Sequence, residues 1–406
     1  MTSTKFIQNK TALITLIAAC LVVLISLGVR QTFGLFFSDF KNDLDISLTE
    51  SGLAVGLQML MWGLSGPIFG AIADKYGGHK AIMLAFVFYI LGIYFLYSGP
   101  NTGIFFQIDM GLLVGIGLGG TAISIPMSIV GKHFPLSNRT IAMSLVTAVG
   151  SFGYFISPMY TSYSLISNGW IHTLYVFTIF LVIGLVIAFF VRSPSLSESI
   201  EKPSDQNTMS ALKEAFKTKS YVLLTAGFFV CGFHITLVGT HVPTYVIDRG
   251  LETWTAAAIL SLIGLFNIFG SLFSGYLSTK MKKKVILAAI YALRGISICL
   301  FIFLPASNIN AFIFGASFGF LWLSTVPATS GIVAQMFGTK HLGMLYGIVF
   351  LSHQIGSFFG SFLGGLFHDI YGSYDYAWYL AIALSIFAAI IHVPIKEEPV
   401  LRLKTE

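Results

Sequence analysis

The stretch "FGAIADKYGGHKAIM", residues 69–83, is a short charged turn between two long apolar runs. These runs, 52–73 and 79–98, are each close to the ~20 residues that a helix needs to cross a bilayer. A related stretch, "SGYLSTKMKKKVIL" at 274–287, recurs in the second half of the chain with one residue fewer. The pattern predicts a helical membrane protein built from two related halves.

The composition of the whole chain agrees with this prediction. Of its 406 residues, 55% are hydrophobic and only 10% are charged, with a mean hydropathy of +0.83. Soluble domains carry roughly 25% charged residues, so a soluble fold is excluded. We predict an all-α protein with twelve membrane-spanning helices, at 11–37, 52–73, 79–98, 102–131, 139–163, 169–191, 220–247, 254–278, 285–304, 309–334, 342–367 and 375–395. The first span has no small-residue cleavage site, so we expect it to be retained.

The positions of the basic residues predict the orientation in the membrane. Of the 23 lysines and arginines, Lys41 and Arg249 lie on one side, Arg30 and Arg294 lie within spans, and the other 19 lie on the side of the N-terminus. Basic loops stay in the cytoplasm, so both termini are expected there. The net charge of +6 therefore reflects topology and does not indicate a nucleic-acid surface.

The three cysteines, Cys20, Cys231 and Cys299, all fall inside predicted spans. They form no disulfide framework, and their spacing fits no metal site. We therefore expect neither a bound metal nor another cofactor.

A polar, charged loop at 192–219 separates two groups of six spans. We predict an N-terminal bundle at 1–191, a linker at 192–219 and a C-terminal bundle at 220–406. Within the linker, "SALKEAFKTK" (210–219) is expected to form a short amphipathic helix. A second repeat supports the division, because "HFPLSNRTIAMSLVTAVGSFG" (133–153) resembles "MFGTKHLGMLYGIVFLSHQIGSFFG" (336–360). Parallel repeats of six spans are a known transporter plan.

The turn "GAIADKYGGHK" (70–80) closely resembles the loop signature of the major facilitator superfamily. Gly70 permits close helix packing, and Gly77 permits the turn. The resemblance implies that the signature aspartate meets the N-terminus of span eleven, where an anion is favoured, and holds the outward-open state. It thereby assigns a cytoplasmic gate to Gly70, Asp74, Lys75, Gly77 and Lys80.

A finer resemblance, to the monocarboxylate transporter and oxalate/formate antiporter branch, covers most of the chain. It rests on "GVRQTFGLFFSDF" (28–40), "CGFHITLVGTHVPTYVIDRG" (231–250) and "SHQIGSFFGSFLGGLFHDIYGSYDYAW" (352–378). The last two resemble a bacterial subgroup, which implies that the protein lies in a bacterial inner membrane. In that branch a basic residue of span one occupies the position of Arg30. The chain also departs from its relatives: their Asp and Arg of span eight fall at Asn267 and Ser271, and the antiporter lysine of span eleven falls at His353.

Ionisable side chains within spans are candidate functional groups, because charge is costly inside a bilayer. Arg30 and Asp109 each lie about 12 Å from the same membrane surface at 1.5 Å per residue, so we expect them to meet. A guanidinium presents two parallel donors to a carboxylate, which makes Arg30 a candidate for binding an anionic substrate. Asp109 is a candidate proton carrier. The alternative is a purely structural ion pair between Arg30 and Asp109. Both interpretations would hold if the substrate displaces Asp109 from Arg30.

Five further polar groups complete the predicted substrate site, Asn267 among them, and each also has a structural interpretation. Arg294 lies in the middle of span nine, where Asn267 or His353 could supply its partner. His353, next to Gln354, is a candidate for substrate or proton binding because histidine titrates near physiological pH. His241 lies before Pro243 near the outer end of span seven and is a candidate for the mouth of the site. Packing or interhelical hydrogen bonds would explain each residue equally well.

These features favour a secondary active transporter of a small organic anion, a monocarboxylate by resemblance, which works by alternating access with proton symport. The expected partners are this anion, protons and the lipid bilayer, and the expected state is a monomer. A proton-driven exporter of metabolites or drugs is the alternative. A membrane enzyme or a sensor is disfavoured, because the sequence has no nucleophile motif, no metal cluster and no soluble domain.

Overall fold

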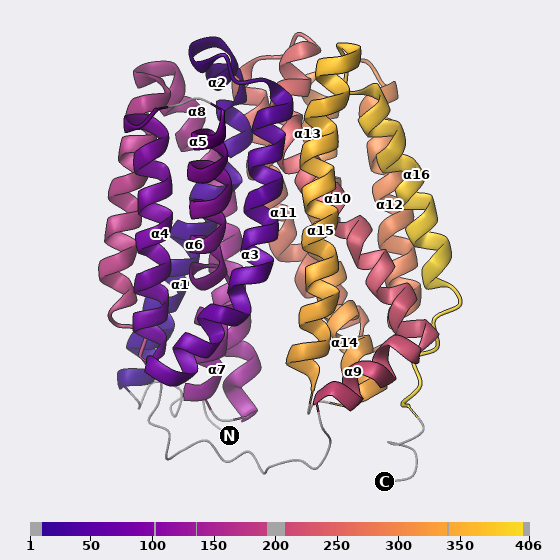
Figure 1. Ribbon diagram of the computed structural model, residues 1–406. Helices are drawn as coiled ribbons and strands as arrows, with labels where there is room; N and C mark the ends of the chain where they lie inside the picture. Colours follow the sequence, from indigo (N-terminus) through magenta and orange to yellow (C-terminus); the bar gives the residue numbers. More distant parts are fainter. Residues whose placement is uncertain (1–9, 101–102, 135, 193–207, 339–340, 401–406) are drawn as a thin grey trace. The chain divides into compact units, whose positions relative to one another are not determined.

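The structure is a computed structural model that describes residues 10–100, 103–134, 136–192, 208–338 and 341–400 (Figure 1). Every regular element in these ranges is a helix, which confirms the all-α prediction. The chain divides into two compact units, Met1–Ile200 and Glu201–Glu406. Residues 193–207 of the predicted linker lie outside the described residues.

The first unit contains six predicted spans, several of them interrupted. Its elements are α1 (Lys10–Gln31), η2 (Phe33–Phe36), α2 (Phe37–Leu44), α3 (Leu48–Tyr76), α4 (Gly78–Ser98), α5 (Ile104–Phe106), η3 (Gln107–Leu113), α6 (Val114–Thr121), α7 (Ser124–His133) and α8 (Leu136–Ala188).

The second unit begins with the short helix expected in the linker. Its elements are α9 (Thr208–Lys217), α10 (Lys219–Asp248), α11 (Thr253–Leu277), α12 (Lys283–Phe303), α13 (Asn308–Leu321), α14 (Thr325–Phe337), α15 (Leu342–Tyr371) and α16 (Asp375–His392).

Eleven helical segments of the described chain are long and apolar enough to cross a membrane. One of them, α8, contains the predicted span 139–163 and all of the predicted span 169–191 up to Ala188. Gly169 interrupts it with a φ of 81°, in the region that favours glycine because it lacks a Cβ. Counting both parts of α8, the described chain contains the twelve predicted spans.

Each unit breaks its fourth span at a corresponding place, where we had predicted continuous helices at 102–131 and 309–334. In the first unit α6 gives way to α7, and Pro126 is the third residue of α7. In the second, α13 gives way to α14, and Pro327 is the third residue of α14. Proline has no amide hydrogen and its ring clashes with the carbonyl four residues earlier, so both helices are interrupted before it.

Glycines allow the closest helix contacts in both units. A Cβ on Gly153 of α8 would collide with the carbonyl oxygen of Leu24 in α1. A Cβ on Gly356 of α15 would collide with the carbonyl oxygen of Phe229 in α10. Small residues let helix backbones approach closely in membranes. The two repeats therefore resemble each other in a helix–helix contact as well as in sequence.

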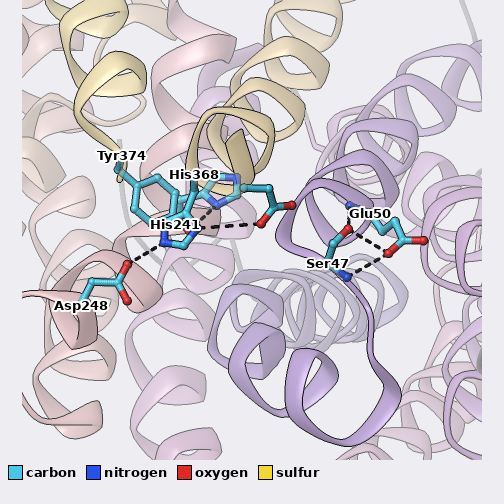
Figure 2. A network of polar contacts seen from close by, with 7 residues as sticks. Ser47, Glu50, His241, Asp248, His368 and Tyr374 are labelled. Carbon is cyan, nitrogen blue, oxygen red and sulfur yellow. Dashed lines mark hydrogen bonds and ion pairs between the residues drawn. The ribbon is translucent and has the colours of Figure 1, made fainter. Parts of the chain in front are cut away.

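The start of α3 is capped within its own chain segment. The Ser47 backbone amide donates to Glu50 Oε2 at 2.9 Å, and the Glu50 amide donates to Ser47 Oγ at 3.1 Å (Figure 2). This reciprocal capping satisfies two amide hydrogens that a helix start leaves free.

After α16, residues 393–400 form a segment that we call the C-terminal strap. Its Glu397 Oε1 accepts a hydrogen bond from the Lys284 amide at 2.7 Å, in the first turn of α12. The Glu397 carbonyl accepts from Gln335 Nε2 of α14 at 2.6 Å. The strap therefore ties the end of the chain to α12 and α14.

Replacing Glu397 with alanine is expected to lower the free energy of unfolding by roughly 2 kcal/mol, because a charged hydrogen bond at a helix N-terminus is lost. The measurement is thermal unfolding of the purified protein. Glu397→Gln keeps an acceptor oxygen and should lose less. Equal losses in the two variants would show that the carboxylate charge has no part in the contact.

Candidate functional site

Arg30 lies in the last turn of α1 and is only 7% exposed. Its Nη2 donates to Met59 Sδ of α3 at 3.3 Å, and its Nη1 donates to the neighbouring Gln31 Oε1 at 3.5 Å. Both contacts are weak, since a thioether is a poor acceptor and 3.5 Å is long. Arg30 Nε has no hydrogen-bond partner among the described residues.

Two tyrosines lie close enough to the Arg30 guanidinium to interact with it electrostatically, Tyr89 of α4 and Tyr154 of α8. The Tyr89 hydroxyl donates to the carbonyl oxygen of Ser26 at 3.1 Å, which fixes that ring against α1. Among the ion pairs of the described residues, none includes Arg30. The first unit thus holds a buried cation among neutral side chains, and no carboxylate of the described residues is bound to it.

The expected pairing of Arg30 with Asp109 is not formed, although both residues are described. Asp109 lies in the π-helical segment η3, whose backbone packs against α4: a Cβ on Gly92 would lie 2.6 Å from the Asp109 carbonyl oxygen. The aspartate is buried, at 6% exposure. Similar depth along two helices did not bring the side chains together, because η3 is oriented by its contacts with α3 and α4.

Arg294 belongs to α12 and is fully buried, and its guanidinium reaches the break between α13 and α14. Its Nη2 donates to the carbonyl oxygens of Leu321 at 2.8 Å and Trp322 at 2.5 Å. Tyr291 and Phe318 lie against the guanidinium, with centroids 5.5 and 5.8 Å from Arg294 Cζ. The partners that we expected for Arg294, Asn267 or His353, are replaced by backbone oxygens that the broken helix leaves free.

Asn267 serves the same break from α11. Its Oδ1 accepts from the Leu323 amide at 3.0 Å and from Ser271 Oγ at 3.2 Å. Asn267 therefore holds the backbone of the broken span, and Ser271 hydrogen-bonds to Asn267. The predicted substrate role of Asn267 stays a prediction.

His353 is buried in the middle of α15 between two aromatic rings. Its ring stacks on Phe350, at a centroid distance of 5.6 Å, and lies 5.0 Å from that of Phe228. Its Nδ1 donates to Gln354 Oε1 at 3.0 Å, because an amide oxygen only accepts. Cys231 of α10 lies close enough to His353 to interact with it electrostatically.

His241 is fully buried in α10, and both of its ring nitrogens are engaged. Its Nε2 donates to the Ser361 carbonyl oxygen at 2.6 Å, and its Nδ1 accepts from the Tyr374 hydroxyl at 3.2 Å. Figure 2 shows Tyr374 against His241, and His368 beside Asp248, whose closest atoms are 3.0 Å apart. These contacts join α10, α15 and the start of α16, so they give His241 a structural task.

The predicted gate lies in the turn between α3 and α4. Gly77 adopts a φ of 97°, as the turn prediction requires, and Gly70 packs near Ile125 of α7. Asp74 forms an ion pair with Lys132 of α7 at 2.8 Å. Lys75 lies over the ring of Tyr76 instead, and Lys80 is exposed. Lys132, the cation that pairs with Asp74, is therefore not one of the gate residues predicted from the sequence.

Reversing the charge of Lys132 with glutamate is expected to slow transport by up to about fivefold, because a partly exposed ion pair contributes at most ~1 kcal/mol. The double variant Asp74→Lys/Lys132→Glu should recover the rate. Uptake into proteoliposomes measures both. Lys80→Glu is the matched control, and an equal effect there would contradict a specific Asp74–Lys132 contact.

Four residues of these surroundings were not selected from the sequence as site residues: Met59, Tyr89, Cys231 and Tyr291. Each lies at an ordinary apolar position of a span. The internal repeat was the one signal available in the sequence, because Tyr89 and Tyr291 lie in the corresponding third spans of the two halves. In the structure the Tyr291 hydroxyl donates to the Gly227 carbonyl oxygen at 2.8 Å, as the Tyr89 hydroxyl does to the Ser26 carbonyl oxygen. The two repeats thus place a tyrosine of the third helix against the first helix, and in this register Cys231 occupies the position of Arg30.

The comparison with known proteins agrees with this architecture. The profile of the Major Facilitator Superfamily matches residues 19–326 and 323–405. Monocarboxylate transporter 13 of Rattus norvegicus is 23% identical over 361 residues, covering 87% of this chain and 82% of that protein. The oxalate:formate antiporter of Oxalobacter formigenes is 23% identical over 362 residues, covering 88% and 85%. Both relatives lie in the branch that the sequence resembles.

A solved structure supports the fold. The crystal structure of a D-xylose-proton symporter superposes with a TM-score of 0.73 at 14% identity, covering 96% of this chain and 99% of that one. The relatives are transporters, which confirms the prediction that the protein is not an enzyme. With its twelve spans in two units and a family match along nearly all of its length, the chain is a multi-pass membrane transporter that belongs to the major facilitator superfamily.

Proposed function

We propose that this transporter carries a small organic anion, of the monocarboxylate class, together with protons, by alternating access. The observation that carries the proposal is the environment of Arg30. A buried guanidinium without a carboxylate partner in the described chain is costly unless an anion binds it. A substrate carboxylate supplies that charge and matches the paired donors of the guanidinium.

The relatives support the substrate class. One is named a monocarboxylate transporter and another an oxalate:formate antiporter, so both names specify carboxylates. Met59, Tyr89 and Tyr154 surround the guanidinium and could accommodate a short acid with an apolar or hydroxylated tail. Arg294 contributes less in this proposal, because its strongest contacts are with the protein backbone.

Proton coupling is proposed to use Asp109 and His353. Asp109 is a buried acid in a π-helical segment, and such segments occur frequently at functional sites. His353 is a buried imidazole beside Gln354 and Cys231. Each side chain can bind a proton, and the two lie in different units.

The test is uptake of labelled pyruvate, lactate, formate and oxalate into proteoliposomes that contain the purified protein. An acidic exterior is expected to accelerate uptake of at least one acid, and a protonophore should abolish the acceleration. Protein-free liposomes correct for diffusion of the neutral acid. Saturable uptake that ignores the pH gradient would overturn the proton coupling, and absence of saturable uptake of any small acid would overturn the substrate class.

Asp109→Asn and His353→Gln separate the two candidate carriers. The variant that removes the carrier is expected to lose uphill accumulation driven by the pH gradient while it retains exchange of internal for external substrate. Counterflow in preloaded proteoliposomes measures the exchange. If both variants keep full accumulation, neither residue carries the proton.

A further inference from the structure

A cavity of about 860 Å³ lies within the second unit, between α9, the start of α10 and the C-terminal strap. This volume lies within the usual range for sites that bind small molecules. Its charged lining consists of four lysines and two glutamates: Lys213, Lys217, Lys219, Lys396, Glu214 and Glu398.

The walls of this cavity are held in place by defined contacts. Ala211 and Ala215 bury one side of α9, at 3% and 0% exposure. On the opposite wall, the Lys396 amide donates to Ser220 Oγ at 2.9 Å, and the Val400 amide donates to the Met336 carbonyl oxygen at 3.0 Å. The lysines of α9 and Lys396 therefore line the same cavity from separate, anchored elements.

The cavity favours an anion for two independent reasons. Its lining carries four lysines against two glutamates, a net charge of +2, and none of the four lysines belongs to the ion pairs found among the described residues. The 30-residue helix α10 also begins at the cavity, and the side chain of Thr218 does not cap it. Free amide hydrogens and the helix dipole make such a terminus attractive to a phosphate group.

Apolar side chains are exposed around the same cavity. Met209 and Phe216 of α9 are 55% and 53% exposed, and Val222 in the first turns of α10 is 43% exposed. Val393, where α16 passes into the strap, is 63% exposed. A ligand that joins a phosphate to hydrocarbon chains would satisfy both kinds of surface, as phospholipids do at the membrane interface.

We propose that this cavity binds the phosphate of an anionic phospholipid headgroup. The lysines and the N-terminus of α10 contact the phosphate, and the acyl chains lie along the exposed apolar side chains of α9, Val222 and Val393. A free phosphate shares the headgroup chemistry but makes no use of the apolar surface, so the two sources can be distinguished.

The experiment uses the purified full-length protein in detergent, with native mass spectrometry to count bound lipid. Phosphatidylglycerol is titrated beside phosphatidylcholine of the same acyl chains, and inorganic phosphate is tested separately by thermal shift. Lys213→Gln/Lys396→Gln removes one lysine from each wall. Lys280→Gln/Lys282→Gln is the matched control, because these exposed lysines of the same unit lie outside the cavity lining.

Wild-type protein is expected to retain phosphatidylglycerol in preference to phosphatidylcholine. Lys213→Gln/Lys396→Gln should raise the half-saturating concentration of phosphatidylglycerol roughly thirtyfold, since each lysine near a lipid surface contributes about fivefold. The control should change it less than about twofold, and both variants should keep the wild-type Tm. Equal weakening in the two variants would overturn the site, as would equal retention of both lipids. Stabilisation by inorganic phosphate without retention of phosphatidylglycerol would overturn the lipid as the source of the phosphate.

Discussion

Replacing Arg30 with methionine is expected to lower the uptake of a transported monocarboxylate roughly a hundredfold or more, while the Tm of the substrate-free protein stays unchanged or rises. Truncating one partner of a buried, hydrogen-bonded charge pair costs ~2–5 kcal/mol, and each 1.4 kcal/mol is a factor of ten. The loss concerns only the substrate-bound protein, because that is where the proposed pair exists.

The expected gain in stability has its own physical reason. In the described chain Arg30 pairs with no carboxylate and has only weak hydrogen bonds, to Met59 Sδ and Gln31 Oε1. Its charge is therefore poorly compensated, and a well-packed apolar side chain of similar length often replaces such a charge without loss. A purely structural arginine would behave in the opposite way, with a lowered Tm and a secondary loss of transport.

Uptake in proteoliposomes and thermal unfolding in detergent together decide between these interpretations. Arg30→Lys keeps the charge but loses the paired donors, so we expect it to fall between methionine and wild type. A substrate that stabilises wild-type protein by mass action should no longer raise the Tm of Arg30→Met. Full uptake by Arg30→Met would refute the anion site.

Replacing Arg294 with methionine should act through folding and lower the free energy of unfolding by about 3 kcal/mol. The variant leaves the carbonyl oxygens of Leu321 and Trp322 buried without their donor, and each such group costs ~1–3 kcal/mol. It also removes a cation from the C-terminal end of α13, where the helix dipole favours one. The contacts with Tyr291 and Phe318 are lost as well.

Removal of the buried charge offsets part of this loss, because Nε and Nη1 of Arg294 have no hydrogen-bond partner among the described residues. The short hydrogen bonds to two backbone oxygens make the net effect of Arg294→Met destabilising. Within the described chain Arg30 makes no such bonds, so its replacement lacks this cost. Asn267→Ala is the matched control at the same break, since it removes the acceptor of the Leu323 amide. A Tm of Arg294→Met equal to that of wild type would contradict the structural role and return Arg294 to the substrate site.

The sequence predicted the class and the number of spans, because both depend on local properties. Twenty apolar residues in a row cross a bilayer wherever they occur, and the charged turn within 69–83, which has a counterpart within 274–287, marks where one helix ends and the next begins. Gly77 illustrates this: its positive φ follows from the absence of a Cβ, which is visible in the sequence. Arg30 was also identifiable, because a charge inside an apolar run needs no structure to be noticed.

The partners of the polar residues were not predictable in this way. Arg30 and Asp109 have similar depth but lie on helices whose rotation about their axes is set by packing, and the sequence does not encode that rotation locally. Lys132 pairs with Asp74 although they are 58 residues apart, and Lys75 beside it does not. Met59 and Cys231 carried no signal, since sulfur side chains are ordinary in apolar spans.

The sequence by itself determined that this protein is an all-helical membrane transporter with two related halves and two buried arginines. Only the tertiary structure distinguished those arginines. Arg294 lies against carbonyl oxygens that a proline-broken helix leaves free, whereas Arg30 lies among neutral side chains with no carboxylate of the described chain. Charge and burial follow from the residue and its span, but its partner depends on which neighbouring helix, broken or continuous, packs against it.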